Sequence, residues 1–212
     1  MHHILVYADS LSWGIIPNTR QRLVFDRRWP GVMENYLHRN NVSVRVIEDC
    51  LNGRRTTLED PFKPGRDGRD GLQEAVEMGS PLALVILMLG TNDFQSMHNH
   101  TTWHSAQGMG ALIAAVRQAP IEPGMPVPPI LLIAPPPIQS PKGPIAPKFV
   151  GGDEKSRGLA AAYEQLARES DCHFLDAGTI TSSSEVDGIH LDEPQHLALG
   201  KAVAEKVAEI IK

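Results

Sequence analysis

Residues 82–89 form the most apolar run of the chain, Leu-Ala-Leu-Val-Ile-Leu-Met-Leu, without one polar side chain. A strand of this kind must be covered on both faces, which is typical of parallel sheets with helices on either side. The run ends abruptly in the polar sequence Gly90-Thr91-Asn92-Asp93. We therefore expect a central buried strand whose carboxyl end carries polar groups.

Strand and helix patterns alternate along the rest of the chain. Further strands are predicted at residues 4–7, 42–47, 129–134 and 172–175. Helical patterns cover residues 29–38, 71–78, 105–118, 153–170 and 194–211, with Asp153 as the expected cap of the fourth helix. Five alternations predict an α/β fold, a three-layer α/β/α sandwich around a five-stranded, mostly parallel sheet. No break demands a second domain, so we expect a single domain over residues 1–212.

Composition excludes several classes of protein. A formal net charge of −5 leaves no basic excess for a nucleic-acid partner. No apolar run approaches the length of a membrane helix, and no secretion leader is visible. The two cysteines, Cys50 and Cys172, do not make a disulfide framework, so a cytoplasmic protein is expected.

The first predicted strand stops at Ala8 and is followed by Asp9 and Ser10. In open α/β sheets, ligands bind at the carboxyl ends of the strands. Ser10 is therefore a candidate nucleophile, with its N–H at the start of a helix. The ordinary alternative is that Asp9 or Ser10 only caps that helix.

Other predicted strands also end in polar clusters: Asn52-Gly53, Gly90-Thr91-Asn92-Asp93 and Asp176-Ala177-Gly178, and Asp187-Gly188-Ile189-His190 precedes the last helix. A parallel sheet brings such ends to one rim. Acyl transfer needs a hydroxyl, a base, a carboxylate that orients the base, and donors for an oxyanion. Each cluster alone has an ordinary reading as a turn or a solvated loop. The set and its order favour acyl transfer.

Taken together, Ala-Asp-Ser-Leu (8–11), Asn-Gly (52–53), Gly-Thr-Asn-Asp (90–93) and Asp-x-x-His (187–190) resemble the four blocks of the SGNH, or GDSL-type, hydrolases. Trp13-Gly14, Arg55-Thr56-Thr57 and Val186 to His190 further resemble the bacterial arylesterase and acyltransferase subgroup. The resemblance implies a flavodoxin-like sheet and a triad with Ser10 as nucleophile, His190 as general base and Asp187 as its orienting acid. It also implies an oxyanion hole formed by the Ser10 N–H, the Gly53 N–H and the Asn92 side chain.

One position departs from the family pattern. Ala8 stands where the family usually has glycine, so a methyl group precedes the nucleophile. The turn is unstrained if φ at Ala8 is negative, and strained if it is positive.

Several other residues could contribute to function. The candidates for a substrate pocket are Asp9, Leu11, Trp13, Phe94, Trp103 and Ile138. His98, His100 and His104 lack the Cys or carboxylate partners of a metal site, so we interpret them as loop residues and expect neither metal nor cofactor. His196 is interpreted as structural, and Cys50 as buried and inert.

The predicted function is a serine esterase that acts on short-chain aryl, alkyl or acetyl esters, with possible acyl transfer or perhydrolysis. The alternatives are a carbohydrate acetyl esterase, a thioesterase, or a member of the same fold that only binds ligand. The expected partner is a small-molecule ester. The resemblance also implies a homo-oligomer, and we expect the long loops 15–28 and 135–152 to pack between subunits.

Overall fold

The apolar run at 82–89 forms the centre of a five-stranded sheet. The computed structural model describes residues 1–211, and in it all neighbouring strands are parallel, in the order β2-β1-β3-β4-β5. The strands are β1 (His2–Ala8), β2 (Val44–Cys50), β3 (Leu84–Met88), β4 (Ile130–Ala134) and β5 (His173–Asp176). All five predicted strands are confirmed, and β3 is buried along its whole length as its composition requires.

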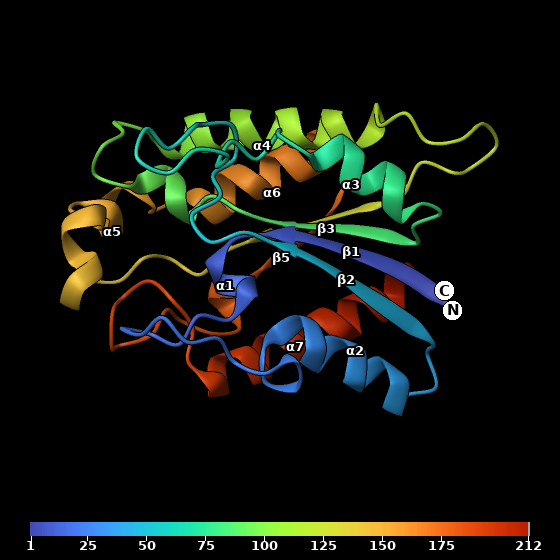
Figure 1. Ribbon diagram of the computed structural model, residues 1–212, viewed down its shortest axis with the longest axis horizontal. Coiled ribbons are helices and arrows are strands. Elements are labelled where there is room, and N and C mark those ends of the chain that lie inside the picture. Colours follow the sequence, from blue (N-terminus) through green and yellow to red (C-terminus); the bar gives the residue numbers. More distant parts are fainter. Residues whose placement is uncertain (212) are drawn as a thin grey trace.

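Helices cover both faces of the sheet, which confirms the three-layer α/β sandwich (Figure 1). One face carries α1 (Ser10–Trp13), α2 (Trp29–Arg39) and α7 (Glu193–Ile210), and the other carries α3 (Leu72–Gly79), α4 (Thr102–Arg117) and α6 (Leu159–Glu169). A short α5 (Gly152–Lys155) lies beyond one end of the sheet, and 3-10 turns occupy Phe25–Arg27, Thr91–Phe94, Gly143–Phe149 and Ala177–Thr179. No helix within residues 1–211 is long and apolar enough to cross a membrane.

The side chains of β1 alternate between two hydrophobic cores. Ile4, Val6 and Ala8 pack in the core that also contains residues of α2 and α7. Leu5 and Tyr7 pack in the core under α3, α4 and α6. Because a parallel strand buries both faces, neither set of β1 side chains is polar.

Two helix predictions are wrong in detail. The helix predicted over residues 153–170 is interrupted, because Gly158 adopts a left-handed conformation (φ 85°) between α5 and α6. Asp153 consequently does not cap that helix; it lies inside α5, whose cap is Gly151. The helix predicted from residue 105 begins at Thr102, since Thr101 and His104 form a capping box. Trp103 and His104 are therefore helical rather than part of a loop.

The strand order places a crevice at the carboxyl end of β1. After β1 the chain passes to β2 on one side and then returns to β3 on the other, and such a switch point is where doubly wound sheets bind ligands. Ser10 follows β1, Gly53 follows β2 and Asn92 follows β3. The topology thus brings these three predicted site residues to one rim.

Candidate active site

The turn after β1 presents Ser10 at the first position of α1. Asp9 caps this helix, with its Oδ1 accepting a hydrogen bond from the Leu11 N–H at 2.9 Å. Ser10 itself is 6% exposed. Within the described residues Ala8 is an extended strand residue and not one of those with positive φ, so its methyl group causes no backbone strain. The cap and the candidate nucleophile are therefore neighbours, and the two readings of this stretch are compatible.

Asp187 and His190 form a tight, mostly buried pair. Asp187 Oδ2 lies 2.7 Å from His190 Nδ1, and Asp187 Oδ1 accepts from the Ile189 and His190 N–H groups, each at 2.9 Å. Gly188 between them has φ 78°, and a Cβ on it would lie 2.4 Å from the Ser140 carbonyl oxygen. This turn therefore requires glycine, and the carboxylate fixes both the loop and the imidazole ring.

The electrostatics of this pair keep Asp187 charged. Burial acts to raise the pKa of Asp187, but the hydrogen bonds from His190 and from the Ile189 N–H outweigh it and leave the pKa below its usual value. An ionised Asp187 holds the Nδ1 proton of His190, which leaves Nε2 free to accept a proton.

Hydrogen bonds connect the helix that carries Ser10 to the helix that follows His190. Ser12 Oγ accepts from Trp29 Nε1 at 2.9 Å, and the Trp29 N–H donates to His196 Nδ1 at 3.2 Å. Burial lowers the pKa of His196 to about 3, so this histidine stays neutral as an acceptor. The position of His196 supports its predicted structural role, because His196 connects α7 through Trp29 to Ser12 on α1.

Ser10 and His190 are both nearly buried at the same rim, yet the Ser10 hydroxyl makes no hydrogen bond within residues 1–211. Catalytic hydrogen bonds are often long before substrate binds, so a free hydroxyl is compatible with a nucleophile.

Asn92 links the ends of β1, β2 and β3. Its Nδ2 donates to Asp9 Oδ2 at 3.0 Å and to the Arg54 carbonyl oxygen at 3.1 Å. Gly53 has φ 86°, which L side chains rarely adopt. Both Asn92 amide hydrogens thus have acceptors, so an oxyanion would share one of them in a three-centre hydrogen bond.

Sequence reasoning missed a buried layer behind Asn92. Gln95 Nε2 donates to Asn92 Oδ1 at 2.7 Å, and Gln95 Oε1 accepts from the fully buried Arg55 guanidinium. Arg55 also pairs with Asp60 at 3.2 Å. This layer fixes the orientation of the Asn92 amide. Arg55 belongs to the subgroup-like Arg-Thr-Thr sequence, but no pattern in the sequence pairs it with Gln95.

A cavity of about 530 Å³ opens on the Asp187–His190 pair. Its lining residues are Ile15, Asn18, Thr19, Arg20, Pro144, Ile145, Lys148, Asp187 and His190. The loops 15–28 and 135–152, expected to pack between subunits, therefore supply most of this lining within one chain. Asn18 Nδ2 donates to the Val186 carbonyl oxygen at 3.2 Å, which ties the first loop to the Asp187 loop.

Most of the predicted pocket residues lie elsewhere. Leu11, Phe94 and Ile138 are at most 4% exposed and belong to the hydrophobic cores, because the turns that carry them fold back onto the sheet. Trp103 is 62% exposed and lies on α4, away from the residues that line the cavity. The apolar residues that line this cavity are Ile15, Pro144 and Ile145, whereas Phe94 and Ile138 line a smaller separate hollow, so a substrate-binding role for the four residues stays a prediction.

The remaining two predicted pocket residues take other positions. Trp13 ends α1 and stacks under the Arg22 guanidinium, 4.8 Å from the ring centroid. Asp9 is 1% exposed and acts on Asn92 rather than on the cavity.

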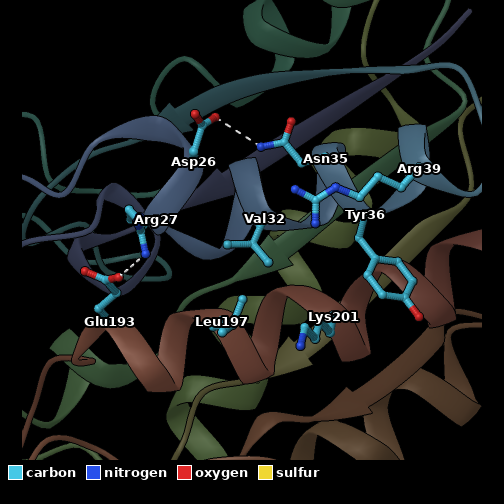
Figure 2. Close-up of a pocket in the computed structure, with 9 residues that line it drawn as sticks. All are labelled: Asp26, Arg27, Val32, Asn35, Tyr36, Arg39, Glu193, Leu197 and Lys201. Carbon is cyan, nitrogen blue, oxygen red and sulfur yellow. Dashed lines mark hydrogen bonds and ion pairs between the residues drawn. The ribbon is translucent and has the colours of Figure 1, made fainter.

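A second hollow, of about 490 Å³, lies between α2 and α7 (Figure 2). Two of its charged side chains are paired across it, with Arg27 Nη1 2.6 Å from Glu193 Oε1. Asp26 Oδ1 accepts from Asn35 Nδ2 at 3.0 Å. No serine or histidine is among its lining residues as described, so it has no nucleophile–base pair.

The rings of His98, His100 and His104 pack in a row at tilted angles of 59° and 39°. Ring centroids of His98 and His100 are 5.6 Å apart, and those of His100 and His104 are 4.9 Å apart. Residues 1–211 contain no group of three or more His, Cys, Asp or Glu side chains able to hold a metal ion.

Cys50 is half-buried, and its Sγ contacts the Val6 carbonyl oxygen at 3.7 Å. Burial raises the pKa of this thiol well above its usual value. A thiol held protonated is a poor nucleophile, which supports the prediction that Cys50 is inert.

The buried Asp9 carboxylate should give folding stability a distinctive pH dependence. Burial raises the pKa of Asp9 to about 7, against opposing hydrogen bonds from Leu11 and Asn92 and the charge of His190. The folded state therefore binds a proton that the unfolded state releases near pH 4, so stability falls as pH rises from about 4 to about 7. We expect the free energy of unfolding of the wild type, relative to Asp9→Asn, to fall by up to roughly 4 kcal/mol over this window. Urea titrations across that range measure it, and parallel curves for the two proteins would refute the assignment.

Loss of the Asn92 amide is expected to lower kcat. Asn92→Ala should lower kcat on an ester substrate by about 10²–10³, because one oxyanion donor is lost. It also removes the hydrogen-bond partner of Gln95 Nε2 and of Asp9 Oδ2, which should lower the free energy of unfolding by roughly 1–3 kcal/mol. Kinetics at a temperature well below unfolding separate the two effects. An unchanged kcat would exclude Asn92 from the oxyanion hole.

The α/β sandwich and the rim arrangement of Ser10, Asp187, His190 and Asn92 define a class, the serine hydrolases with a doubly wound sheet. Residues 9–198 match the GDSL-like lipase/acylhydrolase family. The chain belongs to this family, and it is an ester hydrolase.

Solved structures of similar proteins agree with this assignment. A carbohydrate acetylesterase from Sinorhizobium meliloti is 36% identical with a TM-score of 0.93, over 99% of both chains. The inhibitor-bound aryl esterase of M. smegmatis is 34% identical with a TM-score of 0.93, over 99% of this chain and 100% of that chain. A second S. meliloti protein, a carbohydrate acetylesterase family member, is 32% identical with the same TM-score, over 100% of this chain and 99% of that chain. No curated protein matches the sequence.

Proposed function

We propose that this protein hydrolyses short-chain acyl esters through an acyl-enzyme on Ser10. The observation that carries the proposal is the Asp187–His190 pair, with 2.7 Å between carboxylate and imidazole, on the rim where Ser10 begins α1. The similarity to an aryl esterase supports aryl esters among the substrates.

In the proposed first step, His190 Nε2 takes the proton of Ser10 as Oγ attacks the ester carbonyl carbon. The tetrahedral oxyanion accepts hydrogen bonds from the Ser10 and Gly53 N–H groups and from the Asn92 amide. The bond to the alcohol oxygen then breaks, and His190 returns the proton to the departing alcohol.

In the second step a water molecule attacks the acyl-enzyme while His190 accepts its proton. Collapse releases the carboxylic acid and returns the proton to Ser10 Oγ. An alcohol or peroxide in place of water would give acyl transfer or perhydrolysis by the same route.

The test is a series of p-nitrophenyl esters from acetate to octanoate, with and without a serine-reactive inhibitor. Pro144 and Ile145 line the cavity of about 530 Å³ beside His190, and for a short-chain esterase we expect kcat/KM to be highest at acetate and to fall with chain length. Inhibitor treatment should abolish the signal. No hydrolysis of any ester by the folded protein would contradict the proposal.

A second candidate is deacetylation of a carbohydrate. The polar lining residues Asn18, Thr19 and Arg20 favour it, as does the similarity to a carbohydrate acetylesterase. Acetate release from acetylated sugars, compared with release from phenyl acetate, distinguishes the two candidates.

We also propose a cytoplasmic homo-oligomer. The free cysteines Cys50 and Cys172 support a reducing compartment. Sedimentation of the purified protein tests the oligomeric state.

A further inference from the structure

We propose that the cavity beside His190 selects esters that carry a negatively charged group, and that Lys148 and Arg20 bind this group. The inference rests on the proposed esterase function and adds to it the charge of the substrate.

Two cations line the same cavity as the Asp187–His190 pair. Asp187 and His190 line one part of it, and Arg20 and Lys148 come from the two covering loops. In Figure 1 the blue loop after α1 and the orange-red loop before α7 lie side by side, as the Asn18–Val186 hydrogen bond requires. An ester held with its carbonyl at Ser10 would therefore extend past His190 toward these cations.

The carboxylates near the cavity do not neutralise these cations. Asp187 is the single carboxylate among the described lining residues, and it is engaged by His190. Lys148 Nζ lies 4.0 Å from Asp60, which already pairs with Arg55 at 3.2 Å. Within residues 1–211, no carboxylate lies at ion-pair distance from Arg20. Among the described residues, Lys148 thus shares Asp60 with Arg55, and Arg20 lines the cavity without a counter-charge.

A further cation lies behind the oxyanion hole. A Cβ on Gly53 would be 3.8 Å from both Cδ and Nε of Arg66, so this side chain covers the Gly53 turn. Its Nε donates to the Asn52 carbonyl oxygen and its Nη1 to those of Pro64 and Gly65. These acceptors are neutral and leave the positive charge uncompensated.

Burial and the neighbouring cations also act on Lys148. Burial lowers the pKa of the half-buried Lys148, Asp60 opposes this, and the charges of Arg55, Lys63 and Arg66 lower it further. The chain as a whole carries a formal charge of −5, so this concentration of positive charge is local to the cavity. A local positive potential attracts negatively charged ligands even when the whole protein is negatively charged.

The apolar lining residues limit the kind of anion. Ile15, Pro144 and Ile145 provide surface for a short hydrocarbon or an aryl ring. The chemistry therefore fits a small ester with one carboxylate, such as an acetylated hydroxy-acid. A phosphate or sulfate group could bind the same cations. Esters that carry such a group are therefore compared with the carboxylate ester in the test below.

The test compares 4-acetoxybenzoate, an anion at pH 7.5, with its neutral analogue 4-acetoxybenzamide. Each kcat/KM is divided by the rate constant for hydroxide-catalysed hydrolysis, which removes the difference in leaving group. We expect the wild type to prefer the anion by roughly tenfold, the equivalent of one charge-assisted contact. The preference should decline as NaCl is raised from 20 mM to 500 mM, because salt screens exposed charges.

Variants identify the residues. The double substitution Lys148→Gln with Arg20→Gln should bring the anion-to-neutral ratio close to one. Lys142→Gln is the matched control: Lys142 lies in the same loop as Lys148, but its Nζ donates to the Glu185 carbonyl oxygen and it does not line the cavity. This control should retain the wild-type ratio.

The outcomes separate the two proposals. If the wild type hydrolyses neither acetate, the esterase function fails. If it hydrolyses both at equal corrected rates, or if the double variant retains the preference, the charge selection fails while the esterase function stands. Should the double variant not fold, a salt-independent ratio in the wild type would overturn the inference. A preference for 4-acetoxyphenyl sulfate over the benzoate would identify the group as sulfate-like.

Discussion

Replacement of Ser10 by alanine is expected to lower kcat/KM for p-nitrophenyl acetate by about 10⁴- to 10⁶-fold. The loss follows because Ser10 supplies the hydroxyl that attacks the ester in the proposed mechanism, and alanine has no nucleophilic atom in its place. The fold should persist, since the Ser10 hydroxyl makes no hydrogen bond within residues 1–211 and alanine favours helix.

Ser12→Ala is the matched control on the same helix. The Ser12 hydroxyl accepts a hydrogen bond from Trp29 Nε1. The Ser12→Ala variant should therefore lose roughly 1–3 kcal/mol of free energy of unfolding while still forming an acyl-enzyme. Stopped-flow measurement of the p-nitrophenol burst compares the two variants. Near-wild-type turnover in Ser10→Ala would refute its role as nucleophile.

Asp187→Asn is expected to lower kcat by about 10³- to 10⁴-fold with little change in the loop. An asparagine Oδ1 can still accept from the Ile189 and His190 N–H groups, which now lie 2.9 Å from Asp187 Oδ1. Its Nδ2 would instead face His190 Nδ1 and donate to it. His190 would then carry its proton on Nε2 and could not accept the proton of Ser10.

The Asp187→Asn substitution should also change how the free energy of unfolding depends on pH below about pH 4. Hydrogen bonds hold the pKa of Asp187 below its unfolded value, so its contribution to stability is present above about pH 4 and lost as pH falls further. Urea titrations at pH 7 and pH 3 should show a smaller acid-induced loss for Asp187→Asn than for the wild type. Activity within tenfold of wild type would show that His190 does not depend on Asp187.

Much of this fold could be predicted because the information is local. Apolar runs such as residues 82–89 specify buried strands, and each catalytic candidate follows directly on a strand or precedes a helix. The break at Gly158 could not be predicted from periodicity, because the apolar spacing continues across it while the backbone turns left-handed.

The substrate cavity was less predictable than the catalytic residues. Its lining combines Ile15 and Arg20 with Ile145 and Lys148, from loops more than a hundred residues apart and without regular patterning. Phe94, beside the Gly-Thr-Asn-Asp block, is fully buried because its 3-10 turn folds onto the core under α4 and α6. The Arg55–Gln95 contact likewise joins two loops that only the sheet order brings together.

Covalent trapping tests the central claim, that Ser10 is the nucleophile of an ester hydrolase, most directly. The folded protein is treated with diethyl p-nitrophenyl phosphate, and intact mass and peptide mapping locate the adduct. We predict one diethylphosphoryl group per chain, on Ser10, with parallel loss of esterase activity and no adduct on Ser10→Ala. Labelling of Ser10→Ala to the same extent, or an active enzyme that carries no adduct, would contradict the account.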